Sequence, residues 1–123
     1  MSKTLVIFDI DGTLLYSNKV DSQCFADTYH RIYKRKFPTI DWAKYPHVVD
    51  DVIFRTVIRN EFNREPEDLE VFDFQNAFSE SIIEKRKTDP HEFLEVPNAV
   101  DTLHYLINRE EYLVGIATGG WHR

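Results

Sequence analysis

Two short apolar runs lie near the ends of the chain, and each stops abruptly at small or acidic residues. Residues 4–8 (TLVIF) have no polar interruption after Thr4, and residues 9–12 (DIDG) follow them directly. Residues 112–117 (YLVGIA) form a similar run that ends at residues 118–120 (TGG). Continuous apolar runs of this length are typical of strands that a parallel sheet buries on both faces. The pattern predicts two such strands, each with a turn at its carboxyl end.

Residues 19–88 have the periodicity of helices instead. Apolar residues recur every three to four positions in three successive stripes. Proline-containing breaks lie at residues 37–39, 45–47, 64–66 and 88–90. The pattern predicts a helical insert with an aromatic core. The stripes are Val20, Cys24, Tyr29, Ile32 and Tyr33; Val49, Val52, Ile53, Val57 and Ile58; and Leu69, Phe72, Ala77, Phe78, Ile82 and Ile83. The aromatic residues expected in the core are Phe25, Phe54, Phe62, Phe72, Phe74 and Phe78.

A further helix is predicted over residues 97–109, just before the second strand. Pro97 suits a first helical position, and Arg109 suits the last turn. Between them, an apolar stripe at helical spacing consists of Val100, Leu103, Leu106 and Ile107. A helix followed by a buried strand is half of an α/β unit, so the fold class is predicted to be α/β.

Composition narrows the class of protein. The chain has 123 residues, of which 42% are hydrophobic, and this amount of apolar material suits one small globular domain. The net charge of −6 argues against nucleic-acid binding, which needs a basic surface. No apolar stretch approaches the roughly 20 residues that span a bilayer. Cys24 is the single cysteine, so no internal disulfide can form and a reducing, cytoplasmic setting is expected.

The two aspartates after the first strand carry the strongest chemical signal. Asp9 and Asp11 are one residue apart at a strand end, where open α/β sheets bind ligands. Two neighbouring carboxylates repel each other unless a cation intervenes, and oxygen ligands favour Mg²⁺. Gly12 allows a sharp turn after the pair, and Thr13 adds a hydroxyl. An ordinary turn after a strand is the alternative interpretation of these residues.

The complete string of residues 8–14 (FDIDGTL) is more specific than the aspartates alone. It resembles the first motif of the haloacid dehalogenase superfamily of phosphohydrolases, and residues 117–120 (ATGG) resemble that superfamily's second motif. The resemblance implies that Asp9 is the nucleophile that becomes an aspartyl phosphate, and that Asp11 is the general acid/base. It also implies that both aspartates hold Mg²⁺, with the Asp11 backbone carbonyl as one ligand.

The second motif implies a phosphate-binding role. By resemblance, the Thr118 hydroxyl and the Gly119 amide hold a phosphoryl oxygen, and Gly12 belongs to the same phosphate site. Taken alone, Thr118 suits a strand end or a helix cap equally well.

The position of the helical insert resembles the same superfamily. Members similar to phosphoglycolate phosphatase and β-phosphoglucomutase carry a helical cap domain between the two motifs, which closes over the site and selects the substrate. The resemblance implies a partial Rossmann-like core over residues 1–15 and 91–123, and a helical cap domain over residues 16–90. His47 and Asp50 are either substrate contacts from this cap or, as we favour, surface residues at a helix start.

The implied activity is Mg²⁺-dependent hydrolysis of a small phosphorylated metabolite through an aspartyl phosphate. Two further motifs of the superfamily, a Lys or Arg and a pair of acids, have no place before Arg123. We therefore expect an N-terminal portion of a longer phosphatase, with sheet edges that favour association with another chain. Residues 121–123 resemble the start of a helix.

Two alternatives differ in class from an active phosphatase. The first is a catalytically incompetent fragment that binds a phosphometabolite or a partner chain. The second, a receiver domain that accepts phosphate on an aspartate, fits poorly. Receivers place their acidic pair and acceptor aspartate on different strands and lack a large helical insert after the first one.

Overall fold

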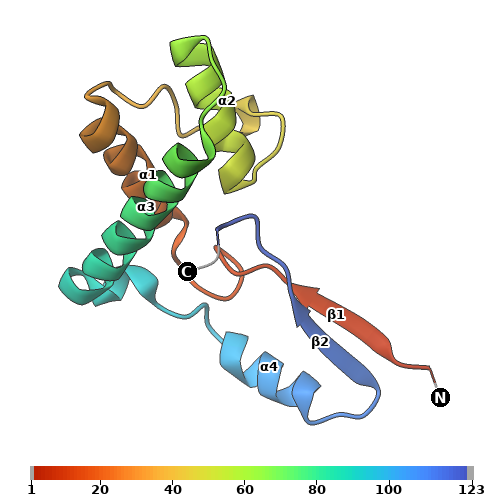
Figure 1. Ribbon diagram of the computed structural model, residues 1–123. Coiled ribbons are helices and arrows are strands. Elements are labelled where there is room, and N and C mark those ends of the chain that lie inside the picture. Colours follow the sequence, from red (N-terminus) through yellow and green to blue (C-terminus); the bar gives the residue numbers. More distant parts are fainter. Residues whose placement is uncertain (1, 122–123) are drawn as a thin grey trace.

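Two strands and four α-helices form within residues 2–121, the part of the chain that the computed structural model describes (Figure 1). The helix start expected at residues 121–123 lies outside the described residues except for Trp121. The elements are β1 (Thr4–Phe8), α1 (Asn18–Tyr33), the 3₁₀ helix η1 (Trp42–Lys44), α2 (Asp50–Phe62), α3 (Asp68–Thr88), the 3₁₀ helix η2 (Pro90–Phe93), α4 (Ala99–Ile107) and β2 (Tyr112–Ile116). No helix within this range combines the length and apolar character needed to cross a membrane.

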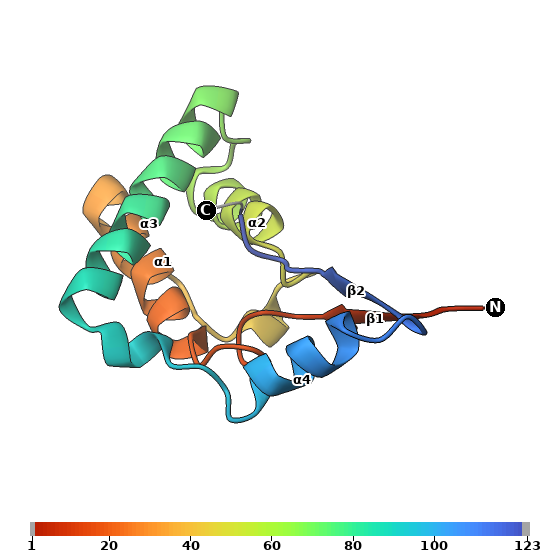
Figure 2. The same cartoon turned by 90° about the horizontal axis from the view of Figure 1, so that it is seen from below.

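The two strands pair in parallel, which confirms the predicted α/β class with strands at both ends of the chain. β1 and β2 align Thr4 with Tyr112 and Phe8 with Ile116. Because both strands run in the same direction, the segments that follow them leave the same edge of the sheet. Helices α1, α2 and α3 lie beyond that edge, whereas α4 lies along one face of the sheet (Figure 2). The division into a core and a cap domain at residues 16–90 stays a prediction.

The expectation that the strands are buried on both faces is wrong. Leu5 and Ile7 of β1 are 59% and 58% exposed, and Leu113, which pairs with Leu5, is exposed as well. Side chains alternate between the faces of a strand, so these three residues share one face. Helix α4 packs against β2, and one helix covers only one face. Association with another chain through this sheet stays a prediction.

Aromatic side chains form the core of the bundle of α1, α2 and α3, as predicted. Phe25 of α1 lies 5.1 Å from Phe74 and 5.3 Å from Phe78 of α3, measured between ring centroids. Phe54 of α2 stacks on Phe74 at 4.3 Å. Trp121, which follows β2, stacks on Phe25 at 5.9 Å. The segment after the second strand therefore belongs to the same core as the helices.

The third predicted stripe is confirmed at Phe78 and Ile82 and is wrong at Leu69, Phe72 and Ile83. Leu69 and Phe72 are 67% and 58% exposed, and Ile83 is exposed as well. Helix α3 is apolar on two faces with the same helical period, so periodicity alone does not tell which face turns inward. The aromatic rings of α1 and α2 determine that face. The residues of α3 that are buried are Val71, Phe74, Phe78 and Ile82.

The first two stripes are confirmed except at their margins. Ile32 is exposed at the end of α1, and Val49 is exposed because it precedes α2. Cys24 packs in the core as predicted, and this burial raises the pKa of its thiol.

Helix α4 is shorter than predicted. It begins at Ala99 and not at Pro97, because Asn98 has a φ of 68°, in the left-handed region that a right-handed helix cannot include. Of its predicted apolar stripe, Leu103 and Leu106 are half-buried, whereas Val100 and Ile107 are exposed.

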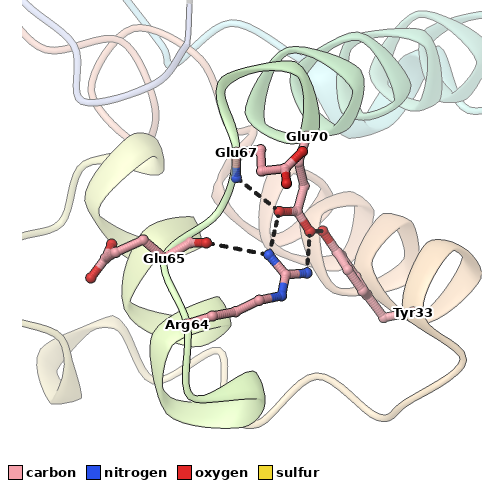
Figure 3. Close-up of polar contacts among 5 residues, drawn as sticks. All are labelled: Tyr33, Arg64, Glu65, Glu67 and Glu70. Atoms are coloured by element: carbon pink, nitrogen blue, oxygen red, sulfur yellow. Dashed lines mark hydrogen bonds and ion pairs between the residues drawn. The ribbon is translucent and has the colours of Figure 1, made fainter.

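A cluster of hydrogen-bonded polar residues connects the turn between α2 and α3 to the end of α1 (Figure 3). Arg64 donates two hydrogen bonds to Glu70, at 2.8 and 2.9 Å, and the Tyr33 hydroxyl donates to the same carboxylate at 2.7 Å. The Glu67 backbone N–H also donates to Glu70, as part of a capping box at the start of α3. These donors, Arg64 foremost, lower the pKa of Glu70 to about 2. The cluster therefore links all three helices of the bundle.

Candidate active site

The segment after β1 folds into a tight turn over residues 10–15. The Ile10 carbonyl accepts hydrogen bonds from the backbone N–H groups of Thr13, Leu14 and Leu15, at 3.2, 2.9 and 3.1 Å. Gly12 has a φ of 83°, a conformation that residues with a side chain rarely adopt. Gly12 is therefore the residue that allows this turn.

Asp9 and Asp11 lie at the start of the turn. Asp9 is exposed directly after β1, and Asp11 is half-buried. The Ser17 hydroxyl donates to Oδ1 of Asp11 at 2.5 Å. Ser17 is buried and precedes α1 without capping it, so its hydroxyl serves the aspartate and not the helix. Sequence reasoning missed this residue, although a serine before a helix pattern is a recognisable signal.

The segment after β2 runs beside the turn. The Ala117 N–H donates to the Phe8 carbonyl at 2.9 Å, which continues the pairing of the strands by one step. The Thr118 hydroxyl then accepts the Gly120 N–H at 3.1 Å. Thr118 thus braces a local turn, close to the strand-end role that the sequence left open, and its side chain is exposed.

The first residue of α2 holds this second segment from the other side. The Asp50 N–H donates to the Gly119 carbonyl at 2.9 Å, and Oδ2 of Asp50 accepts the Trp121 N–H at 2.9 Å. Asp50 is only 9% exposed, so its interpretation as a surface residue is wrong: it is buried by the segment that it binds. His47 is exposed, as expected.

Four of the five predicted site residues line one hollow of about 150 Å³, which we call the aspartate pocket. They are Asp9 and Asp11 from the first turn and Thr118 and Gly119 from the second segment. Gly12 does not line it, and its phosphate-binding role stays a prediction. The other lining residues are Asp21, Ser22, Phe25, Trp42, Val48, Asp50, Ile53 and Gly120. The strand ends therefore form one wall and the helical segments the other.

A second hollow of about 270 Å³, which we call the side pocket, shares Asp11, Asp21 and Thr118 with the first. It adds Ser17, Arg86 and an apolar wall of Ile10, Leu15, Ile82, Phe93 and Trp121. Sequence reasoning missed Asp21 and Arg86, because each lies within a helical charge pattern that carries no motif. A larger hollow of about 660 Å³ lies between α1 and residues 36–40, but no residue of the strand ends lines it.

The carboxylate oxygens of the aspartate pocket are of the type that binds Mg²⁺. Among the described residues, no three His, Cys, Asp or Glu side chains converge to hold a metal ion. Mg²⁺ keeps several waters in proteins and is held by one or two carboxylates together with substrate phosphates. Asp9 and Asp11 can supply such a pair. No Lys or Arg of residues 2–121 lines this pocket, so an anion there needs another positive charge, which a divalent cation would supply.

Comparison with protein families identifies one match over nearly the whole chain. A family model described as haloacid dehalogenase-like hydrolase matches residues 6–123. No curated protein matches the chain significantly.

Solved structures share the fold. A hydrolase from Pseudomonas syringae has a TM-score of 0.71 and 18% identity, over 98% of this chain and 51% of its own. A predicted phosphoglycolate phosphatase from Haemophilus somnus 129PT has a TM-score of 0.62 and 18% identity, over 98% and 52%. A HAD hydrolase, family IA, variant 3, from Entamoeba histolytica HM-1:IMSS has a TM-score of 0.64 and 16% identity, over 94% and 48%. The chain spans about half the length of each.

Proposed function

The chain belongs to the haloacid dehalogenase-like hydrolases, and from this membership we propose that it carries the nucleophile and phosphate loop of a Mg²⁺-dependent phosphomonoester hydrolase. The proposed substrate is a small phosphorylated metabolite. One observation carries the proposal: Asp9, Asp11, Thr118 and Gly119 come from opposite ends of the chain and line the same pocket. Parallel pairing brings the two segments together, and the pocket between them then combines two carboxylates with a threonine and a glycine, the residues that the proposed reaction uses.

In the proposed reaction, a carboxylate oxygen of Asp9 forms a bond to phosphorus while the bond between phosphorus and the leaving oxygen breaks. Asp11 donates its proton to that leaving oxygen. A water molecule then attacks phosphorus and gives its proton to Asp11, and the bond to Asp9 breaks to release phosphate. Thr118 and the Gly119 amide hold phosphoryl oxygens. When bound, Mg²⁺ supplies the positive charge that this acidic pocket lacks.

Ser17 supports the acid/base role of Asp11. Its hydroxyl binds Oδ1, which leaves Oδ2 as the oxygen to exchange a proton with the substrate. The buried position of Ser17 fixes the orientation of the carboxylate. Ser17 is therefore a positioning residue in the proposed mechanism.

Binding without turnover is the second candidate function. It is favoured by the absence of a Lys or Arg from the described lining of the aspartate pocket. Loss of one charge-stabilising group commonly slows catalysis by about a hundredfold or more.

Hydrolysis of 4-nitrophenyl phosphate with and without Mg²⁺ distinguishes the two candidates. The intact mass of 14.6 kDa should be verified in the same sample. We expect turnover that requires Mg²⁺ and that falls by at least about a hundredfold in Asp9→Asn. Asp101→Asn is the matched control, because Asp101 is an exposed aspartate of α4 outside both pockets. Absence of turnover at the verified mass, with phosphate binding retained, would select binding without turnover.

A further inference from the structure

The side pocket joins the aspartate pocket to an apolar wall and one cation. It shares Asp11, Asp21 and Thr118 with the aspartate pocket. A substrate whose phosphoryl group lay beside Asp11 and Thr118 would have room for its organic part in the side pocket. Ile82, Phe93 and Trp121 form part of the apolar wall there. Arg86, from the last turns of α3, is the cation that lines this hollow among the described residues.

The guanidinium of Arg86 is available for a ligand. Arg86 forms no ion pair within residues 2–121, whereas its neighbour Lys85 is bound to Asp89 at 3.0 Å. Its guanidinium carbon lies 5.7 Å from the centroid of the Phe93 ring, close enough for a cation–π contact. This contact restrains the side chain and leaves its hydrogen-bond donors free for an anion. Arginine presents these donors as a planar fork that matches a carboxylate or a phosphate.

We propose that the side pocket binds the organic part of a phosphomonoester that carries a second anionic group, and that Arg86 binds this group. The inference rests on the proposed function, because the phosphoryl group must occupy the aspartate pocket first. Two chemical features then define the substrate: a transferable phosphoryl group, and a carboxylate or second phosphate at the far end of a short carbon skeleton. Neutral sugar or alcohol phosphates would leave the guanidinium without an anionic partner.

Two phosphomonoesters with the same skeleton test this assignment. In 3-phosphoglycerate the carbon remote from phosphorus is a carboxylate, and in glycerol 3-phosphate it is a hydroxymethyl group. Binding of each ester to the full chain is measured by calorimetry in the presence of Mg²⁺. Every protein in the comparison carries Asp9→Asn, so that neither ester is hydrolysed during the titration, and the wild type here is the protein that keeps Arg86. We expect the wild type to prefer 3-phosphoglycerate by about tenfold, the effect of one charge-assisted hydrogen-bonded pair.

Arg86→Met removes the charge and keeps a side chain that can pack on Phe93. It should lower the affinity for 3-phosphoglycerate about tenfold and leave the affinity for glycerol 3-phosphate unchanged, so that the preference disappears. Lys87→Met is the matched control, because it removes the same charge one residue along, at an exposed position outside both pockets. It should leave both affinities unchanged. Arg86→Lys keeps the charge and should retain part of the preference, which separates loss of binding from loss of folding.

Three results would overturn the assignment. Equal weakening of both esters by Arg86→Met would mean that Arg86 acts on the phosphoryl group and not on a second anion. If the wild type binds glycerol 3-phosphate and 3-phosphoglycerate equally well, the proposed recognition of a second anion is refuted, whereas the proposed phosphate site is not. If the wild type binds neither ester, the proposed phosphate site fails, and this inference fails with it.

Discussion

A methyl group at Gly119 should destabilise the whole protein, because this glycine lies under the start of α2. A Cβ atom at Gly119 would lie 2.4 Å from the backbone oxygen of Val48 and 3.5 Å from its carbonyl carbon. Neither atom belongs to a flexible side chain, so the backbone of one segment must move. Overpacking of this kind costs about 1–3 kcal/mol. If the segment moves away instead, the two hydrogen bonds of Asp50 to Gly119 and Trp121 are lost, at about 1 kcal/mol or more each.

Either way, Gly119→Ala should lower the free energy of unfolding by about 2–3 kcal/mol. Urea denaturation followed by tryptophan fluorescence measures this directly. Gly115→Ala is the matched control, because a Cβ there meets Ile7 and Leu5 side chains at ordinary distances of 3.8 and 4.0 Å. It should change the free energy of unfolding by less than about 1 kcal/mol. If the two substitutions lowered the free energy of unfolding equally, the close approach of Gly119 to Val48 could not be the reason for the loss in Gly119→Ala.

Two further predictions concern the helical bundle. Glu70→Gln should lower the free energy of unfolding by about 1–2 kcal/mol at pH 7. This value is smaller than the lowered pKa of Glu70 alone would give, because Arg64 is half-exposed and solvent screens the ion pair. Because Arg64 and Tyr33 lower the pKa of Glu70 to about 2, this stabilisation is present above pH 4.5 and is lost as the pH falls toward 2. Urea denaturation should show a smaller difference in the free energy of unfolding between wild type and variant at pH 3 than at pH 7. An equal difference at both pH values would contradict the link between the pKa of Glu70 and stability. Phe74→Ala should lower the free energy of unfolding by about 3–5 kcal/mol, and Phe72→Ala should lower it by less than about 1 kcal/mol, because Phe74 is buried and Phe72 is exposed. Comparable losses in the thermal unfolding of these two variants would mean that α3 presents another face to the core.

The strands and the meeting of Asp9 with Thr118 could be predicted because each depends on a short pattern. An uninterrupted apolar run indicates a strand wherever it occurs, and parallel pairing then brings the residues after both strands to one edge. Neither step requires knowledge of how the helices pack. The number of covered faces was not predictable in this way, since exposure of Leu5 and Ile7 depends on which other elements lie against the sheet.

The contributions of α1 and α3 to the side pocket could not be predicted, because they depend on helix orientation. Asp21 and Arg86 are ordinary charged residues of α1 and α3, and only the packing of these helices brings them to the side pocket. The same reason explains the error at Leu69 and Phe72. A helix with two apolar faces has two orientations of nearly equal hydrophobic character, and contacts with Phe25 and Phe54 select one.

The position of the Thr118–Gly120 segment depends on the helical bundle as well as on the sheet. Asp50 binds this segment at Gly119 and Trp121 through its own backbone and side chain. Trp121 in turn stacks on Phe25 within the bundle core. The Gly119 backbone amide, which we propose binds phosphate, thus lies in a segment fixed at one end by strand pairing at Ala117 and at the other by aromatic packing of Trp121. Because protein interiors are densely packed, a rotation of α1 or α2 would shift Trp121 and Asp50 together, and the segment would move with them. The helical bundle therefore contributes to the geometry of the segment proposed to bind phosphate, even where none of its side chains lines that segment.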